Sequence, residues 1–363
     1  MKLIRFLLNS VVVMFVVLFS IFFAYIYNDN RAINSDTKFV EIAEEIKPII
    51  IPENSQETEK VLLVEPAKVP SLTSSEEIIA QSNKYYYQQL DDYAKLIYEA
   101  LENEKNALKT GNKVINLPSK LGEVLEKGNS MEAVFSVAIN AFECDNPDLF
   151  YLDASKLILY YERNAFGNYK IYLKNEEEYS NYLLDDYKNE QDVNIAKSRI
   201  DEVVSNIEVE LNKLSDDYNK ILYIHDWITE KVTYDTTLSK INKDNIYGAF
   251  VEKEAVCGGY AKAFKYLLDR ANINCIIVQG IGTAQGRENH AWNYAQLNGI
   301  WYGVDCTWDD PVIIGDLRYY IEQKYYTYFL KGENIFNNDH IPFENFYGTN
   351  LKLSYPKLSE EDY

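Results

Sequence analysis

A cysteine, a histidine and an aspartate stand in three short motifs in the last third of the chain, and their types suit a nucleophile, a base and an orienting acid. The sequence reads V-C-G-G-Y-A-K-A-F around Cys257, N-H-A-W-N around His290 and V-D-C-T-W-D-D-P around Asp305. In acyl transfer a thiolate attacks a carbonyl carbon, an imidazole moves the protons, and a carboxylate orients the imidazole. Cys257, His290 and Asp305 are therefore the candidate catalytic triad.

The residues that follow Cys257 predict the helix that positions it. Apolar side chains recur there every three or four residues, which is typical of an amphipathic helix: they are Tyr260, Ala261, Phe264, Leu267, Leu268 and Ala271. Cys257 then lies in or just before the first turn, where unpaired amides and the helix dipole favour a thiolate. Gly258 and Gly259 are poor helix formers, and they indicate that another segment approaches the backbone closely here.

A hairpin is expected to place His290 and Asp305 on two neighbouring strands. The pair Asn298-Gly299 is the strongest two-residue turn signal and predicts a type I′ turn. Continued along both strands, this register gives three pairs: Leu297 with Ile300, Trp292 with Asp305, and His290 with Thr307. Because opposite residues share a face, as do residues two apart, His290 and Asp305 should be diagonal neighbours on one face, within reach of the Cys257 thiolate.

The oxyanion of a tetrahedral intermediate needs hydrogen-bond donors as well. The backbone amide of Cys257 is one candidate. Tyr247, in the upstream stretch N-I-Y-G-A-F, is the candidate side-chain donor.

The other histidines and cysteines are assigned structural roles. His225 lies in the apolar stripe of a predicted helix, which favours a buried, hydrogen-bonded core histidine over catalysis, and His340 has no partner that the sequence indicates. Cys144, Cys275 and Cys306 are expected to be structural thiols, since the chain is too long and too poor in cysteine for a disulfide framework. Neither Cys-x-x-Cys nor His-Glu-x-x-His spacing occurs, so no metal and no cofactor is predicted.

These motifs carry a resemblance to a known family. The stretches G-A-F-V-E-K-E-A-V-C-G-G-Y-A-K-A-F, N-H-A-W-N and V-D-C-T-W-D-D-P resemble the transglutaminase-like superfamily, a circularly rearranged relative of papain-type cysteine proteases. The resemblance covers Leu214 to Leu330. It is greatest to a bacterial branch similar to the transglutaminase-like domain of fungal cytokinesis proteins.

The resemblance implies roles for three residues and a fold for the domain. Cys257 would be the nucleophile, His290 the base and Asp305 the orienting acid; some members of the family have lost such residues, but this chain keeps all three. The implied fold is α+β, papain/transglutaminase-like, with the cysteine-bearing helix packed on an antiparallel sheet that bears the histidine and the aspartate.

The N-terminus differs from the rest of the chain. Lys2 and Arg5 precede an apolar run from Phe6 to Tyr27, which is long enough to span a bilayer. Bulky residues at its end disfavour cleavage by a signal peptidase, and the basic residues place the N-terminus inside. Residues 1–27 are therefore expected to form a transmembrane signal anchor in the cell membrane, with the catalytic domain outside the cytoplasm; a cleaved signal peptide is the alternative.

Three further regions follow this segment. Residues 28–76 contain several prolines and many charges without a sustained period, which predicts an extended linker. Residues 77–190 mix helical and strand patterns and predict a small α+β accessory domain that packs against the enzyme or positions its substrate. Residues 191–363 are assigned to the catalytic domain.

The charge composition disfavours one class of binding partner. A net charge of −20, from 36 basic and 56 acidic residues, argues against nucleic acid, because phosphate binding needs a basic surface. The expected protein is a membrane-anchored, extracytoplasmic cysteine acyltransferase, peptidase or amidase acting on a protein or peptide, with cell-wall peptide as one such class. Water as the acceptor would give hydrolysis and an amine would give cross-linking. The alternative is a scaffold of the cell envelope or division machinery that binds without turnover.

Overall fold

The computed structural model describes residues 58–59, 84–176, 178–284, 286–310, 325–346 and 349–363. The predicted signal anchor at 1–27 and almost all of the linker at 28–76 lie outside the described residues. No helix in the described part of the chain combines the length and the apolar character needed to cross a membrane.

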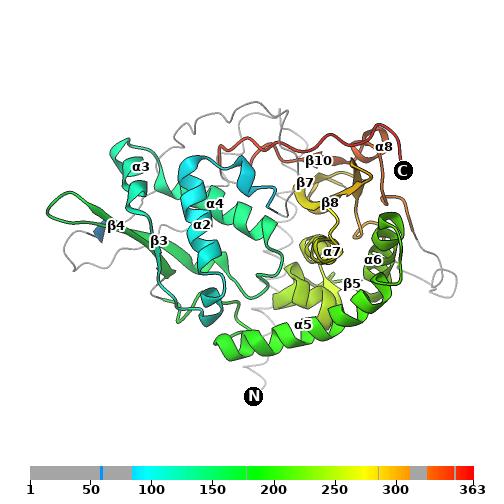
Figure 1. Ribbon diagram of the computed structural model, residues 1–363, viewed down its shortest axis with the longest axis horizontal. Coiled ribbons are helices and arrows are strands. Elements are labelled where there is room, and N and C mark those ends of the chain that lie inside the picture. The colour runs from blue at the N-terminus through cyan, green and yellow to red at the C-terminus, as the bar shows by residue number, and fades with distance from the viewer. Residues whose placement is uncertain (1–57, 60–83, 177, 285, 311–324, 347–348) are drawn as a thin grey trace, which may run out of the picture. The chain divides into compact units, whose positions relative to one another are not determined.

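The first part of the described chain builds a four-stranded antiparallel sheet with two helices beside it (Figure 1). Its strand order is β1-β3-β4-β2, and the strands are β1 Thr58–Glu59, β2 Ile115–Leu117, β3 Leu157–Arg163 and β4 Tyr169–Asn175. The helices α2 (Asp92–Asn103) and α4 (Met131–Asp145) pack against each other. The shorter elements are η2 Tyr87–Gln89, η3 Ala107–Thr110, η4 Ser119–Leu121, α3 Gly122–Glu126 and η5 Ala154–Lys156.

The apolar periodicity near residue 77 predicts one helix up to Gly111, and this prediction is wrong where the chain is described. Helix α2 begins only at Asp92, because the side chain of Asp91 accepts hydrogen bonds from the amides of Tyr93 and Ala94 and so caps a new start. At the other end, Gly111 adopts a positive φ of 75° and ends η3.

Two long helices lead toward the candidate site. Helix α5 spans Glu190–Leu211, with Asn189 as its cap. Helix α6 spans Asp217–Lys231 and begins after a cap at Asp216. Short segments follow: β5 Thr233–Tyr234, η6 Ile241–Asp244, the π-helical η7 Gly248–Glu252 and β6 Glu254–Ala255.

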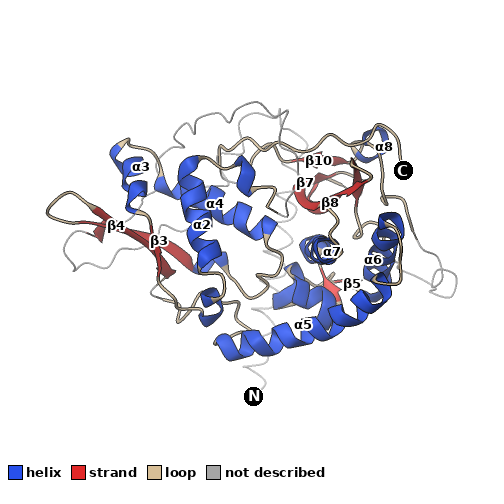
Figure 2. Cartoon of the chain, in the orientation of Figure 1, coloured by secondary structure: helices blue, strands red, loops and turns tan. Residues whose placement is uncertain are grey.

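The second sheet carries the histidine motif and has helix α7 packed on it (Figures 1 and 2). Its order is β10-β7-β8-β9 and its neighbouring strands are antiparallel: β7 Cys275–Gly282, β8 Glu288–Leu297, β9 Ile300–Val304 and β10 His340–Pro342. Helix α7 spans Cys257–Arg270, and α8 spans Glu333–Phe336. The predicted α+β class, with a cysteine-bearing helix on an antiparallel sheet, is confirmed.

The accessory segment and the segment after it share buried contacts. The Tyr85 hydroxyl donates to the Ser354 carbonyl over 2.6 Å, and the Asn245 side chain donates to the Phe150 carbonyl over 3.1 Å. Residues 51–363 accordingly form one compact unit. The boundary near residue 190 stays a prediction from the sequence.

Candidate active site

Cys257 is the first residue of α7, as its sequence context predicts. The preceding Val256 is extended and provides no side-chain cap, so its side chain leaves the amides of the first turn uncapped. The Cys257 side chain is partly exposed and packs against a small apolar cluster of Ala261, Ile277 and Ala291. The thiol thus sits at an accessible helix N-terminus.

The two glycines after Cys257 are required by a close approach of η6. A Cβ atom on Gly258 would lie 1.7 Å from Oδ1 of Asp244, and one on Gly259 would lie 2.5 Å from the carbonyl oxygen of Lys243. The same Lys243 carbonyl accepts a 2.9 Å hydrogen bond from the Val256 amide. Because η6 lies against the start of the helix, it fixes the position of the nucleophile.

The predicted hairpin is present, although its ladder is shorter than expected. Asn298 and Gly299 have φ values of 54° and 81°, as a type I′ turn requires, and Leu297 pairs with Ile300. The register continues only to the pair Asn293–Val304, where β9 ends. The two predicted pairs beyond it, Trp292 with Asp305 and His290 with Thr307, are therefore corrected.

The ladder stops there because Asp305 folds the following chain into a turn. Its Oδ1 atom accepts hydrogen bonds from the amides of Thr307, over 2.8 Å, and Trp308, over 3.2 Å. Its own carbonyl accepts one from the Asp309 amide over 3.1 Å. Side chains of Asp and Asn commonly compete with strand pairing in this way.

His290 and Asp305 nevertheless meet. Nε2 of His290 lies 2.6 Å from Oδ2 of Asp305, and both residues are buried, with 6% and 1% of their surface exposed. Burial alone would lower the pKa of His290, but the charge and hydrogen bond of Asp305, followed by Cys257, raise it to about 10. Burial would raise the pKa of Asp305, but the His290 and His340 rings hold it well below its ordinary value.

The thiol and the imidazole also interact. A hydrogen bond with Cys257 is among the causes that raise the pKa of His290. Since Nε2 is occupied by Asp305, Nδ1 is the ring nitrogen left for the thiol. The Trp308 ring stacks on His290 with its centroid 4.6 Å away, and a Cβ atom on Gly282 would lie only 2.7 Å from Trp308. The glycine therefore makes room for the stack that holds His290.

His340, for which the sequence indicates no partner, belongs to this site, and that expectation is corrected. Its Nε2 atom lies 3.1 Å from Oδ2 of Asp305, and the residue is 1% exposed. It lies on β10, which joins the sheet beside β7. No local pattern in the sequence could have found it, because the pairing brings in a strand from far along the chain.

His290, Asp305 and His340 also form the one group of described residues with three metal-ligand atoms close together, all within 4.8 Å of one another. Both imidazoles, however, direct Nε2 at the same carboxylate oxygen within hydrogen-bond distance. This arrangement is that of a hydrogen-bonded network, and we interpret it as such.

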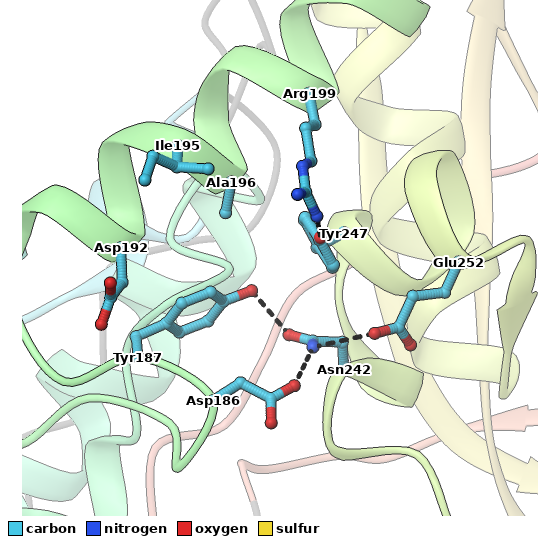
Figure 3. A pocket seen from close by; sticks show the side chains of 9 residues that line it. All are labelled: Asp186, Tyr187, Asp192, Ile195, Ala196, Arg199, Asn242, Tyr247 and Glu252. Carbon is cyan, nitrogen blue, oxygen red and sulfur yellow. Dashed lines mark hydrogen bonds between the residues drawn. The ribbon is translucent and has the colours of Figure 1, made fainter.

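Tyr247, the predicted oxyanion donor, is not brought to the triad. Its hydroxyl accepts a 3.0 Å hydrogen bond from Arg199 and faces a separate cavity of about 280 Å³ (Figure 3). That cavity is lined by Asp186, Tyr187, Asp192, Ile195, Ala196, Arg199, Asn242, Tyr247 and Glu252. None of Cys257, His290 and Asp305 is among them, so the assignment of Tyr247 is corrected.

Tyr234 takes the place near the nucleophile that the sequence analysis gave to Tyr247. Tyr234 pairs in parallel with Ala255, which lies two residues before Cys257. Because Val256 is extended, the side chains of Ala255 and Cys257 lie on the same side of the chain. Burial and the neighbouring Cys257 raise the pKa of Tyr234 to about 12. Within the described residues its hydroxyl has no hydrogen-bond partner. A two-residue parallel pair leaves no sequence signal, which explains why it was missed.

The other three cysteines and His225 are buried, as expected for residues with a structural role. Cys144, Cys275 and Cys306 are buried, free and far less accessible than Cys257, and burial raises the pKa of each well above its ordinary value. His225 is buried, with Nε2 3.0 Å from Asp309, which confirms it as a hydrogen-bonded core histidine.

Part of this chain is similar to known proteins. The family model described as "Transglutaminase-like superfamily" matches residues 205–306. Human kyphoscoliosis peptidase is 29% identical over 164 residues, which cover 40% of this chain and 24% of that protein. The mouse kyphoscoliosis peptidase is 27% identical over 162 residues, with the same coverage. Among solved structures, a TGase aligns with a TM-score of 0.30 and 14% identity, over 45% of this chain and 48% of its own.

The predicted resemblance to the transglutaminase-like superfamily is therefore confirmed for residues 205–306. The chain spans about a quarter of the length of the curated relatives it matches. The finer likeness to the branch of fungal cytokinesis proteins stays a prediction.

Proposed function

We propose that this protein is a cysteine-dependent acyl-transfer enzyme that cleaves an amide or peptide bond through Cys257, His290 and Asp305. The observation that carries the proposal is the 2.6 Å contact between His290 and Asp305, with Cys257, at the start of α7, close to the same imidazole. The likeness of residues 205–306 to the transglutaminase-like superfamily supports the same class of chemistry.

The geometry supports a two-step reaction. The Cys257 thiolate attacks the carbonyl carbon of the substrate, and the carbonyl π electrons move to its oxygen. When the tetrahedral intermediate collapses, the C–N bond breaks and the His290 imidazolium gives its proton to the departing amine, leaving a thioester. His290, now neutral, takes a proton from the second nucleophile as it attacks the thioester, and the Cys257 thiolate leaves. Asp305 stays ionised throughout and stabilises the imidazolium.

Two hydrogen-bond donors near Cys257 are candidates to stabilise the oxyanion. The Cys257 amide lies in the first turn of α7, where no intrahelical acceptor exists for it. The Tyr234 hydroxyl lies beside Cys257 and has no other partner within the described residues. Two such donors form the kind of site in which the largest part of the barrier reduction arises.

The substrate class follows from the same chemistry. A partly exposed thiol on a protein surface suits a polypeptide substrate, and the name of the human relative, a peptidase, supports hydrolysis of peptide bonds. Residues 1–27 support membrane attachment with the catalytic domain outside, where cell-wall peptide would be one accessible substrate. Membrane fractionation with added protease tests this location: a domain protected in intact cells would contradict it.

Selective alkylation tests the nucleophile. Iodoacetamide in limiting amount at about pH 6 should modify Cys257 first, because only this thiol is partly exposed beside a histidine at a helix start. Cys144, Cys275 and Cys306 are internal controls in the same chain, read by mass spectrometry of the peptides. If Cys257 reacts no faster than these three, the chain is a binding scaffold with no turnover.

A further inference from the structure

His340 contacts the acid of the proposed triad at the same oxygen as His290. Its Nε2 atom lies 3.1 Å from Oδ2 of Asp305, the same oxygen that lies 2.6 Å from Nε2 of His290. The two imidazole centroids are 5.9 Å apart. One carboxylate oxygen thus accepts hydrogen bonds from both rings.

The pairing of the strands brings the His290 and His340 imidazoles together. His290 lies opposite Gly280 on β7, and His340 lies opposite Gly282 on the same strand, so both rings leave the sheet on one face. A Cβ atom on Gly280 would lie 2.5 Å from Trp292, and one on Gly282 would lie 2.7 Å from Trp308. The glycines on β7 thus leave the space that the Trp292 and Trp308 rings occupy beside the two imidazoles.

Both nitrogens of His340 face acceptors. Nδ1 lies 2.8 Å from Oδ1 of Asp339 and 3.2 Å from the carbonyl oxygen of Phe336, while Nε2 faces Asp305. Only a doubly protonated ring can donate on both sides. Asp339 is itself held by the Tyr328 hydroxyl over 2.6 Å, so His340 lies between two carboxylates that each have a further hydrogen-bond donor.

The position of Asp305 does not depend on His340 alone. Its other oxygen, Oδ1, already accepts hydrogen bonds from two backbone amides, those of Thr307 and Trp308. A further donor on Oδ2 therefore adds little to the placement of the carboxylate. Its main effect is to draw negative charge away from the oxygen that binds His290, because two donors on one acceptor compete.

We propose that His340 is a positioning residue that acts through Asp305: by donating to the same oxygen as His290, it limits the negative charge that Asp305 presents to the His290 ring. The inference rests on the proposed function. It matters for turnover because His290 must release a proton to the departing amine, and an imidazolium held too firmly by Asp305 is a poor acid.

The charged and titratable groups around the two rings are few. His290 faces Cys257 from α7 and Asp305 from the turn after β9, and Tyr234 on β5 lies beside that pair. His340 faces Asp305, Asp339 and, through Asp339, the Tyr328 hydroxyl.

The test is an NMR titration of the full chain labelled with ¹⁵N-histidine. The chain has 3 histidines, so the signals are assigned by single substitutions. In the wild type, Nε2 of His340, which faces Asp305, should carry a proton. His340→Phe keeps the stacking on Phe336 and removes both donors. It should move the loss of the His290 proton to higher pH by about half a unit to one unit, because Asp305 then serves His290 alone.

A second substitution at His340 keeps the test valid if His340→Phe does not fold. His340→Gln keeps a neutral donor near Asp305 and should give a smaller shift in the same direction. His225→Gln is the matched control, since it disturbs another buried histidine–aspartate pair, with Asp309, and should leave the His290 titration in place.

The outcomes separate this inference from the proposed function. An Nε2 atom of His340 that carries no proton in the wild type, or a His290 titration that is unchanged or lower in both His340 variants, overturns the inference. If, in addition, Cys257 in the wild type is alkylated no faster than the buried thiols, the proposed function fails as well. A shift to higher pH in both variants, larger for Phe than for Gln, supports the inference.

Discussion

His290 and Asp305 meet beyond the end of the ladder that joins their strands. The last pair of β8 and β9 is Asn293 with Val304, yet Nε2 of His290 lies 2.6 Å from Oδ2 of Asp305. The contact is made by the turn that Asp305 itself stabilises through two backbone amides. Asp305 therefore both shapes the backbone and orients the imidazole, and the two roles can be separated by substitution.

Asp305→Asn should keep the turn and lose the charge. The asparagine side-chain oxygen can still accept from the Thr307 and Trp308 amides, but the pKa of His290 should fall from about 10 toward its ordinary value. Activity on any accepted substrate should fall by about 10⁴-fold, as in other triads that lose the orienting charge. Rate against pH, with circular dichroism for the fold, measures both effects.

Asp309 and Asp310 provide controls for this substitution. Asp309 binds His225, and Asp310 accepts from the Tyr260 hydroxyl over 2.5 Å, so neither contacts His290. Their asparagine variants should change the His290 titration much less. A larger effect at either position than at Asp305 would require a different acid.

Tyr234→Phe tests the oxyanion donor. Loss of one such donor typically lowers kcat by about 10²–10³-fold. We expect a fall of this order with KM little changed, since the hydroxyl would bind the oxyanion rather than the ground state. Steady-state kinetics of Tyr247→Phe is the matched control, because that hydroxyl binds Arg199 at a separate cavity; equal losses for the two variants would remove Tyr234 from the mechanism.

Stability should fall with rising pH in the alkaline range because of His290. Its pKa in the folded protein, about 10, lies above the unfolded value of about 6.5, so the folded state binds more protons between these values. The contribution is therefore complete below about pH 6.5 and is lost as pH rises through about 10, with a slope of at most about 1.4 kcal/mol per pH unit. Urea unfolding at several pH values measures the slope, and His290→Asn should flatten it. An equal slope in the variant would mean that other groups cause it.

The two glycines after the nucleophile should differ in their tolerance of alanine. In Gly258→Ala the new methyl group meets the end of the Asp244 side chain, which is largely exposed and can move. In Gly259→Ala it meets the backbone carbonyl of Lys243, which cannot. We expect Gly259→Ala to cost about 1–3 kcal/mol of stability and Gly258→Ala less.

A second substitution separates these two clashes. Asp244→Ser added to Gly258→Ala should restore part of the loss in Tm, whereas the same addition to Gly259→Ala should not. Thermal unfolding followed by circular dichroism measures the Tm of each glycine variant with and without Asp244→Ser. Rescue of the Gly259 variant would show that the side chain, and not the backbone of η6, limits the space.

The sequence by itself determined the local parts of this site. The apolar spacing after Cys257 predicted α7 and its start, and Asn298-Gly299 predicted the turn and the pairing of Leu297 with Ile300. Both predictions are correct because helix periodicity and turn chemistry are properties of residues close together in the chain. The sequence also predicted that His290 and Asp305 lie close together, but the ladder pairs from which this was argued are absent and a turn makes the contact.

Only the tertiary structure decided which distant side chains join the triad. His340 reaches Asp305 because β10 docks on β7, and Tyr234 lies beside Cys257 because β5 pairs with β6. The same packing turns Tyr247 toward Arg199 and away from the thiol. Short strands carry too few residues to show a period, and their pairing depends on what the rest of the core leaves open. For this reason Cys257 could be placed from its neighbours in the sequence, whereas Tyr234 and His340 could not.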